Sequence, residues 1–472
     1  MASTCHLAVV VLLAVAVAVA RYRGAAAAAA ESGGPEWHVV DDVSSLLPGT
    51  VCTAARAESN SSALTVVHRH GPCSPLRSRG APPPSHAEVL RRDRTRVDAI
   101  NRKIAGNASG ASERVTLPAS WGGISLGVDN YIIKVGLGTP AREFLVEFDT
   151  GSDLSWVQCK PCRGCYKQRD PLFDPARSST FSAVPCGSPE CQDFASPDCT
   201  TDGGKCPYSF FYADESRIEG NLVRDTLTLA PSETLPGFVF GCGDADTGLF
   251  GEADGLFGLA RDKVSLASQA ASKYGAGFSY CLPSSSSSSG YLSLGGAAAA
   301  AAPANVQFTE MVTRSFMPSL YYVNLVGIKV AGRAIKVSPV VFAARGTIID
   351  SGTTISRLPP RAYAALRSAF KSFMAKYKRA PALDMMDTCY DFTGHTRVKI
   401  PPVTLVFGDG ATVSLDARGV LYVSTVSQTC LAFASVDDET FVGVIGNTQQ
   451  KTLAVVYDVA NQKIGFGANG CN

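Results

Sequence analysis

From about Val115 to the C-terminus, the chain is a succession of short apolar runs broken by Gly, Pro and Asp. Runs of this length, rich in Val, Ile, Leu, Tyr and Phe, are typical of β-strands joined by turns. Helical periodicity is sparse over the same stretch, and its best example is residues 361–377, where Leu366, Phe370 and Phe373 fall on one side. The pattern predicts an all-β fold, mainly antiparallel, with one surface helix.

One apolar run occurs twice in related form. Residues 131–137 resemble residues 322–328, and each copy is followed by its own Asp-[Ser/Thr]-Gly triplet. Between the copies lie Ser and Ala runs of low complexity, which are typical of a linker. The duplication predicts two similar lobes, residues 116–305 and residues 306–472, with a cleft between them.

Both triplets stand where an apolar stretch ends. Asp149 follows the run 144–148 and Asp350 follows the run 347–349, so each carboxylate is expected at the end of a strand. A third triplet begins at Asp246, but no apolar strand leads directly into it, and we interpret it as a polar loop. Two carboxylates brought face to face can share one proton, which suits them to general acid and base chemistry.

The first residues of the chain have the pattern of a targeting segment. Residues 7–20 are apolar, too short a run to span a bilayer comfortably, and end in Ala-Val-Ala. This predicts a signal peptide over residues 1–20, with the cleavage site as far as about residue 30. A signal anchor is the alternative, because no Lys or Arg precedes the apolar run.

Residues 31–115 are rich in Pro, Ala and Arg. A helix is predicted over residues 85–104, with four aliphatic side chains on one face and Arg and Lys crowded on the others. The aliphatic face comprises Leu90, Val97, Ile100 and Ile104. We interpret residues 31–115 as a pro-segment whose cations lie over an acidic cleft and hold the protein inactive. The alternatives are a solvated amphipathic helix and a basic patch for nucleic acid. Two sequons in this region, at Asn60 and Asn107, are glycosylation candidates.

Composition excludes several kinds of chemistry. The formal net charge is +2, so no overall field points to nucleic acid or to a membrane surface. His395 is the only histidine after residue 116 and lies in a polar turn, which argues against Ser-His-Asp and Cys-His proteases and against a multi-His metal site. No metal or other cofactor is expected.

Cysteine use indicates an oxidising compartment. Of 15 cysteines, the 12 after residue 116 form an even set that predicts six disulfides. The dense group between Cys159 and Cys206 also has zinc-like spacing, but no histidine lies within it, so disulfides are favoured.

Taken together, the motifs resemble those of the pepsin-like aspartic proteases, and most closely the plant nepenthesin-like group. The resemblance runs from about Tyr131 to Asn472. It is carried by residues 149–156 (D-T-G-S-D-L-S-W), 255–259 (G-L-F-G-L), 350–354 (D-S-G-T-T) and 444–447 (V-I-G-N), and by the Cys-rich insertion. It implies a bilobal pepsin-like acid protease fold and an aspartic endopeptidase that hydrolyses peptide bonds at acid pH.

In such an enzyme Asp149 and Asp350 are the catalytic pair and titrate as a unit. The ionised member takes a proton from a bridging water, and the protonated member hydrogen-bonds the scissile carbonyl. The resemblance implies that the flanking residues support this pair, with Gly allowing the tight turns and the hydroxyls of Ser152 and Thr353 bonding the carboxylates. These supporting residues are Thr150, Gly151, Ser152, Ser351, Gly352 and Thr353. Residues 256–258 and 444–446 resemble the strands beneath the two catalytic loops.

The resemblance also implies a β-hairpin flap over the cleft. Tyr212 fits the flap tyrosine, and Trp156 fits the indole that donates a hydrogen bond to it. Ala213 and Glu215 stand where relatives have Gly, so we expect an altered flap that affects rate and substrate preference rather than fold.

The disulfide pattern of the subgroup, carried over residue by residue, implies six pairs. They are Cys159–Cys162, Cys165–Cys242, Cys186–Cys206, Cys191–Cys199, Cys281–Cys471 and Cys389–Cys430. The residues themselves support only the even count.

We therefore expect a secreted aspartic endopeptidase that is made as a zymogen and acts as a monomer on protein or peptide substrates. After signal removal it is expected to have no membrane span, and nucleic acid is not expected as a partner. The extracellular space and the vacuole are the expected locations, with the plastid as a third option. The alternative function is a catalytically weak or inactive binding or inhibitor protein, because a fold does not fix a function.

Overall fold

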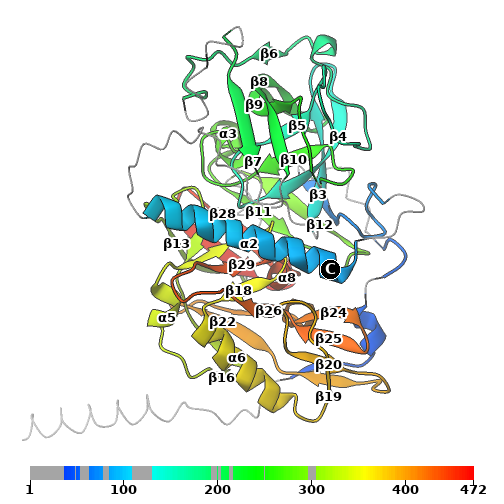
Figure 1. The fold of residues 1–472 in the computed structure, drawn as a ribbon, viewed down its shortest axis with the longest axis vertical. Helices are drawn as coiled ribbons and strands as arrows, with labels where there is room; N and C mark the ends of the chain where they lie inside the picture. The colour runs from blue at the N-terminus through cyan, green and yellow to red at the C-terminus, as the bar shows by residue number, and fades with distance from the viewer. Residues whose placement is uncertain are drawn as a thin grey trace, which may run out of the picture. The chain divides into compact units, whose positions relative to one another are not determined.

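Strands account for most of the structure, as the sequence pattern predicts. The computed structural model describes residues 37–47, 49–53, 63–77, 84–108, 130–192, 199, 204–211, 216–248, 250–295 and 305–471. All the elements named below belong to one compact unit, His38–Asn472 (Figure 1). The predictions that fall on the leader, on Asn60 and on Tyr212 lie outside the described residues.

Twelve strands precede residue 305 in the described part of the chain. They are β1 His38–Val40, β2 Leu64–His68, β3 Tyr131–Leu137, β4 Arg142–Asp149, β5 Trp156–Gln158, β6 Ser182–Ala183, β7 Pro207–Phe211, β8 Arg217–Ala230, β9 Glu233–Gly243, β10 Gly255–Gly258, β11 Phe278–Cys281 and β12 Ser289–Leu294.

The remaining strands follow residue 305. They are β13 Gln307–Val312, β14 Tyr322–Val323, β15 Leu325–Val330, β16 Arg333–Ala334, β17 Thr347–Ile349, β18 Ser356–Leu358, β19 Lys378–Ala380, β20 Cys389–Asp391, β21 Val398–Ile400, β22 Val403–Phe407, β23 Thr412–Ser414, β24 Leu421–Thr425, β25 Gln428–Leu431, β26 Phe433–Ser435, β27 Gly443–Ile445, β28 Ala454–Asp458 and β29 Lys463–Gly467.

The described helices are few and mostly short. They are η1 Val43–Leu46, α2 His86–Ala108, η2 Pro175–Arg177, α3 Leu266–Tyr274, α5 Val340–Ala343, α6 Pro360–Phe373, α7 Ala417–Val420 and α8 Asn447–Gln450. The surface helix predicted over residues 361–377 is α6, and the helix predicted over residues 85–104 is α2.

The duplicated runs occupy equivalent places in the two lobes. In the first lobe, β3 pairs antiparallel with β4, the strand that ends in Asp149. In the second lobe, β14 pairs antiparallel with β17, the strand that precedes Asp350. Each of the two strands that lead to an Asp has an apolar parallel neighbour on its other side, β10 beside β4 and β27 beside β17. The predicted two-lobed, mainly antiparallel fold is confirmed.

The lobes are joined by continuous strand pairing. β11 of the first lobe pairs with β28, which pairs with β29, and β29 pairs with β13 of the second lobe. The same sheet continues from β11 through β12 to β2 and then to β3. Strand β2 comes from the predicted pro-segment, so part of that segment is built into the sheet. The sequence of residues 64–68 gave no sign of this pairing.

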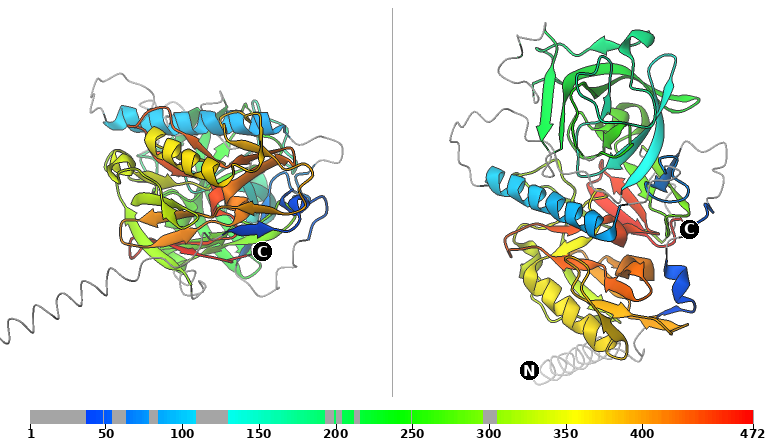
Figure 2. Two further views of the ribbon diagram at one scale, coloured as in Figure 1. Left: turned by 90° about the horizontal axis from the view of Figure 1, so that it is seen from below. Right: turned by 45° about the vertical axis from the view of Figure 1, so that its right-hand side comes forward.

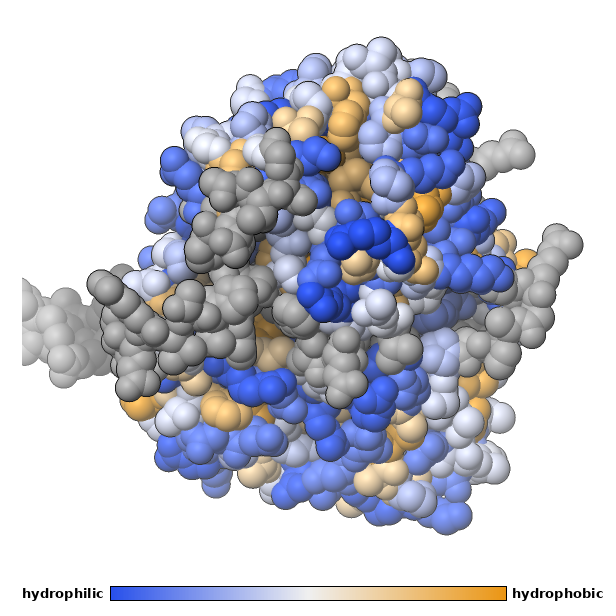
Figure 3. All heavy atoms as spheres, turned by 45° about the horizontal axis from the view of Figure 1, so that its top comes forward, coloured by the Kyte–Doolittle hydropathy of each residue, from blue (hydrophilic) through white to orange (hydrophobic). Residues whose placement is uncertain are grey.

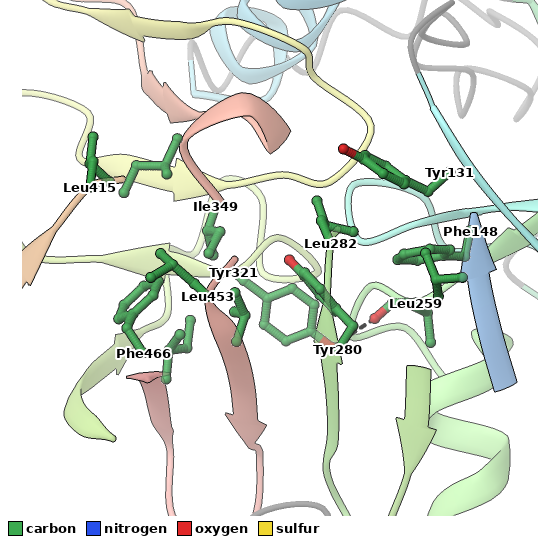
Figure 4. Packing of buried hydrophobic residues seen from close by; sticks show 14 of the residues in the cluster. Tyr131, Phe148, Leu259, Tyr280, Leu282, Tyr321, Ile349, Leu415, Leu453 and Phe466 are labelled. Atoms are coloured by element: carbon green, nitrogen blue, oxygen red, sulfur yellow. Dashed lines mark hydrogen bonds between the residues drawn. The ribbon is translucent and has the colours of Figure 1, made fainter. Parts of the chain in front are cut away.

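One large apolar core contains residues of both lobes (Figure 4). Phe148 and Ile349, the residues immediately before the two Asp, are both buried in it. Across the lobes, the Tyr321 hydroxyl of the second donates a 2.8 Å hydrogen bond to the Leu259 carbonyl of the first. The loops that carry the two Asp therefore rest on one shared core.

Helix α2 lies between strands of the two lobes, as the views in Figures 1 and 2 agree. Its predicted aliphatic face is confirmed, because all four side chains are buried. Three of them, Val97, Ile100 and Ile104, pack against Tyr322, Ile348 and other residues of the second lobe. Leu90 packs beside Ile355 in a neighbouring cluster. The alternative of a solvated helix is therefore wrong.

Two of the six expected disulfides are present, Cys281–Cys471 and Cys389–Cys430, and four are wrong. The expected pairs Cys159–Cys162 and Cys165–Cys242 are replaced by Cys159–Cys242 and Cys162–Cys165. The reason is strand pairing: β5 and β9 run side by side with Val157 opposite Cys242, which brings Cys159 next to it.

The expected pairs Cys186–Cys206 and Cys191–Cys199 are likewise replaced, by Cys186–Cys199 and Cys191–Cys206. Cys191 and Cys206 are both buried in the apolar cluster of the first lobe, whereas Cys199 packs at its rim. The two buried cysteines therefore pair with each other, and so do the two less buried ones, Cys186 and Cys199. A seventh disulfide, Cys52–Cys73, lies within the predicted pro-segment.

The surface fits the near-neutral net charge. On the face drawn in Figure 3, hydrophilic and apolar residues are interspersed. Among the described residues, no helix combines the length and the apolar character needed to cross a bilayer.

Candidate active site

The two Asp are placed by equivalent pairs of strands. In the first lobe, Gly258 of β10 stands beside Asp149, and the Asp149 carbonyl accepts a 2.8 Å bond from the N–H of Leu259. In the second lobe, the Asp350 N–H donates to the Ile445 carbonyl of β27 at 3.1 Å. The strands expected beneath the catalytic loops are therefore where the sequence placed them, and they hold both Asp at the backbone.

Each carboxylate is held by its own triplet and by the residue that follows it. Asp149 accepts bonds from the Ser152 hydroxyl at 2.5 Å and from the Gly151 N–H at 2.9 Å. Asp350 accepts the same two kinds of bond, from the Thr353 hydroxyl at 2.5 Å and the Gly352 N–H at 3.0 Å. Hydrogen bonds of this kind stabilise the ionised form of a carboxylate. In the structure, Ser152 and Thr353 make the contacts that were expected of them.

Thr150 and Ser351 join the two triplets to each other. The Thr150 N–H donates to the Ser351 hydroxyl at 3.1 Å, and the Ser351 N–H donates to the Thr150 hydroxyl at 2.9 Å. Both residues are buried. Sequence reasoning placed these residues beside the dyad but did not foresee this reciprocal bond, which fixes the two loops at one separation.

The role of the two triplet glycines differs from the expected one. Neither Gly151 nor Gly352 is among the glycines with positive φ, so conformational freedom is not what requires them. A Cβ at Gly151 would lie 2.7 Å from an Asp350 carboxylate oxygen, and a Cβ at Gly352 would lie 2.4 Å from Asp149. Glycine is needed because each loop closely approaches the opposite carboxylate.

The dyad is occupied by Arg96, from helix α2. Its Nη2 donates to both Asp149 oxygens at 2.8 and 3.0 Å and to Asp350 Oδ1 at 2.9 Å, while its Nε donates to Asp350 Oδ2 at 3.0 Å. The guanidinium is fully buried. Charge-assisted bonds from one planar group to two carboxylates are among the stronger polar contacts in proteins.

The electrostatic environment shifts the pKa values of the two carboxyls in opposite directions. Burial raises the pKa of Asp149, and the Asp350 charge adds to the rise, against the opposing effect of Arg96. Burial also acts on Asp350, but Arg96, the Thr353 hydroxyl and the Gly352 N–H outweigh it, and the pKa of Asp350 lies below its ordinary value. Asp149 is therefore the more readily protonated member of the pair.

Asp93, one turn before Arg96, is a second buried charge that sequence reasoning missed. It accepts bonds from the N–H groups of Thr354 and Ile355 and pairs with the Arg357 guanidinium at 2.6 Å. A signal was available, because Asp93 interrupts the aliphatic stripe between Leu90 and Val97 at helical spacing.

Arg69 and Glu147 form a third buried contact between the predicted pro-segment and the two lobes (together, the catalytic body). Glu147 lies on β4, two residues before Asp149, and accepts hydrogen bonds from Arg69 and, at 2.5 Å, from the Asn130 side chain. Burial raises the pKa of Glu147, and Arg69 opposes the rise. Sequence reasoning took β4 as an apolar strand and did not single out this carboxylate.

The other candidates are not brought to the dyad. Asp246, interpreted as a loop residue, follows β9 and accepts a bond from the Glu219 N–H at 3.1 Å. Trp156 is buried against Tyr166 and Phe250, and its indole N–H has no partner among the described residues. Its bond to Tyr212 stays a prediction. Asn107 lies on the last turn of α2. Within the described ranges, no group of three or more metal-binding side chains is found.

Comparisons with known proteins agree with this geometry. The profile described as xylanase inhibitor N-terminal matches residues 131–296, and its C-terminal counterpart matches residues 320–468. An aspartyl protease family protein of Arabidopsis thaliana is 44% identical over 443 residues, which cover 91% of this chain and 92% of the relative. Nepenthesin-2, an aspartic proteinase of Nepenthes gracilis, is 33% identical over 392 residues, 81% of this chain and 85% of its own.

Solved structures support the fold. The crystal structure of basic 7S globulin from soybean has a TM-score of 0.57 at 21% identity, covering 72% of this chain and 93% of that one. The structure of edgp has a TM-score of 0.60 at 19% identity, with coverages of 72% and 92%. The relatives of higher identity are named as proteases, and they match most of the chain. The chain therefore belongs to the plant family of pepsin-like aspartic proteases, and it is a peptidase that acts on peptide substrates.

Proposed function

We propose that this chain is the zymogen of an acid-acting aspartic endopeptidase whose dyad, Asp149 and Asp350, is blocked by Arg96. The observation that carries the proposal is the buried guanidinium bonded to both carboxylates. An arginine in that position leaves no place for a water between the carboxylates, and its charge opposes the charge changes that catalysis needs.

Once α2 has left, the dyad has the groups that water activation requires. The ionised carboxylate accepts a proton from a water held between the two Asp, and the oxygen of that water attacks the scissile carbonyl. The protonated carboxyl hydrogen-bonds the carbonyl oxygen as negative charge develops on it. No covalent acyl-enzyme forms, so no histidine is needed. The bonds between Thr150 and Ser351 keep the carboxylates in register through this exchange.

Release at acid pH is proposed to begin at Glu147, because burial raises its pKa whereas Arg96 keeps the pKa of Asp350 below its ordinary value. The buried ion pairs between the proposed pro-segment and the catalytic body are the dyad with Arg96, Glu147 with Arg69, and Arg357 with Asp93 of the segment itself. Protonating a carboxylate removes its half of an ion pair and weakens the hold of the segment. We propose that residues 31–115 are released in this way and cut away, and that the two lobes 116–305 and 306–472 form the mature enzyme.

The route through the cell is part of the proposal. A leader over residues 1–20 and seven disulfides among the described cysteines support passage through the secretory pathway. Delivery to the extracellular space or to the vacuole fits an acid-acting enzyme. The inhibitor alternative has less support, because each Asp accepts two hydrogen bonds from its own loop, Asp149 from Gly151 and Ser152 and Asp350 from Gly352 and Thr353.

The experiment is a peptide-cleavage assay with the purified full chain, before and after acid treatment. We expect cleavage only after treatment, loss of cleavage on adding a statine-type inhibitor, and background rates for Asp149→Ala together with Asp350→Ala. N-terminal sequencing of the product locates the mature start. Cleavage that persists in the double variant would refute the dyad mechanism.

A further inference from the structure

Asp93 of α2 occupies a built anion site next to the dyad. Its Oδ1 accepts the Thr354 N–H at 2.5 Å, and its Oδ2 accepts the Ile355 N–H at 3.2 Å and the Arg357 Nη2–H at 2.6 Å. Asp93 and Arg357 are both buried. Two backbone N–H groups and a guanidinium that converge on one carboxylate form an effective anion-binding arrangement.

Every donor in this anion site belongs to the catalytic body rather than to the helix. Thr354 and Ile355 follow Thr353, the residue after the triplet of Asp350, and Arg357 lies on β18. The Thr354 hydroxyl is also buried there and has no hydrogen-bond partner among the described residues. If α2 leaves, as the proposed function requires, the two N–H groups and the Arg357 charge lose their anionic partner, while Arg357 keeps its 2.7 Å bond to the Ile355 carbonyl.

The anion site has a defined place relative to the dyad. Asp93 lies three residues before Arg96 on the same face of α2, a rise of about 4.5 Å along the helix. The guanidinium of Arg96 is on the dyad while the carboxylate of Asp93 is in the anion site. Because an extended peptide advances about 3.3 Å per residue, the site lies about one or two residues from a scissile bond on the dyad.

We propose that Arg357, with the N–H groups of Thr354 and Ile355, forms an acid-accepting subsite of the mature enzyme. It takes the carboxylate of a substrate Asp or Glu one or two residues from the cleaved bond, and Asp93 occupies the subsite in the zymogen. This inference rests on the proposed function, and it adds a side-chain preference to it.

The surroundings suit an acidic side chain. A cavity of about 270 Å³ adjoins the anion site and is lined by Arg357, Val436, Asp437 and Phe441 from the second lobe and by residues of α2. The charged groups that α2 contributes are Arg94 and Asp98, which leave with it. Asp437 remains, but it is exposed, so water screens its charge. The vacated space gives room for Glu as well as Asp.

The first test uses the activated wild-type enzyme. Sequencing the products of a mixed peptide digest locates the preferred acidic position, and a pair of peptides that differ only by Asp or Asn there is then compared. At pH about 5 the substrate carboxyl is ionised, and we expect kcat/KM for the Asp peptide to be higher by roughly 10- to 100-fold, the range of a charge-assisted hydrogen bond. At pH about 3 the carboxyl is protonated, and the preference should shrink towards unity. Equal rates at pH about 5 overturn the inference.

The second test uses variants. Arg357→Met removes the cation at similar side-chain volume, and we expect the Asp-to-Asn ratio of kcat/KM to fall to about one, chiefly through KM. Arg361→Met is the matched control, because Arg361 is an exposed cation of the same lobe paired with Glu439. An unchanged preference in Arg357→Met overturns the inference, and thermal melting checks that both variants fold.

A third measurement separates this inference from the proposed function. Versions of the same two peptides with a reduced scissile bond bind without being cut, and calorimetry gives their affinities. If the enzyme shows no turnover but binds the Asp version at least about tenfold more tightly through Arg357, the proposed function fails and the subsite stands. If turnover is present and the two versions bind equally, the subsite fails and the proposed function stands.

Discussion

Thr150 and Ser351, which are 201 residues apart in the chain, exchange two hydrogen bonds between the loops that carry Asp149 and Asp350. Each N–H donates to the hydroxyl of the other residue, at 3.1 and 2.9 Å. Because both residues are buried, loss of one hydroxyl leaves an unpaired N–H in the opposite loop. These two bonds are a polar link between the lobes beside the dyad.

Thr150→Val and Ser351→Ala should therefore lower kcat more than they change KM. A hydrogen bond of this kind contributes about 1 kcal/mol, so each variant is expected to lose roughly fivefold to tenfold. The two losses should not add in the double variant, because both remove the same reciprocal bond. Ser372→Ala is the control, since the exposed Ser372 hydroxyl bonds only within α6. Fully additive losses would argue against a shared link.

Glu147→Gln should let the zymogen activate at higher pH. The variant keeps the shape of the side chain but cannot pair ionically with Arg69, so it resembles the protonated wild type. Burial raises the pKa of Glu147 in the folded chain, and protonation is expected to weaken this contact as pH falls. The midpoint of activation, measured as activity after incubation across a pH series, should shift upward.

Glu143→Gln is the control for that series. Glu143 lies on the same strand, but it is exposed, and it pairs with Lys134 on the surface. Exposed pairs contribute little, so its midpoint should match that of the wild type. A midpoint that moves equally in both variants would show that the buried pair has no special part in release.

Asp246→Asn tests how a buried acid makes the free energy of unfolding depend on pH. Burial, with the nearby Asp244 charge, raises the pKa of Asp246 to about 8, whereas its ordinary value is 3.8. Between these values the folded chain binds a proton that the unfolded chain does not, so the free energy of unfolding falls as pH rises. The variant should be more stable than the wild type at pH about 8, by on the order of 2 to 5 kcal/mol, and nearly equal at pH about 4.

Thermal melting at the two pH values measures this difference. Asp409→Asn is the control, because Asp409 is exposed on a turn of the second lobe. Burial raises the pKa of Asp254 to about 7, so this residue should also make the free energy of unfolding fall as pH rises. A wild type and Asp246→Asn that melt alike at both pH values would contradict the assigned protonation.

Short-range sequence patterns predicted the elements whose form depends mainly on neighbouring residues. An apolar run ending in Asp marked the ends of β4 and β17, and helical spacing marked the buried face of α2. The hydroxyls of Ser152 and Thr353 lie three residues from their own Asp, so their contacts are nearly local as well.

Features that depend on distant partners were not visible in the sequence. Many cations crowd α2, and only the packed structure selects Arg96, since its side chain points at carboxylates 53 and 254 residues away. The pairing of strand β2 could not be predicted either, because its partners β3 and β12 lie near the two ends of the first lobe in the sequence. The pairing of Cys159 was decided by the neighbouring strand β9 rather than by spacing in the chain.

The central claim is that Arg96 blocks a dyad that is otherwise ready for catalysis. The most direct test measures the initial rate of peptide cleavage by the intact full chain at pH about 5, with gel analysis to verify that the chain is uncut. The wild type and Arg91→Met, which changes an exposed arginine of α2 that pairs with Glu88, should be latent. Arg96→Met should be faster by at least about tenfold, because the charge-assisted bonds to the dyad are lost. Equal latency of Arg96→Met and the wild type, with both chains folded, would contradict the account.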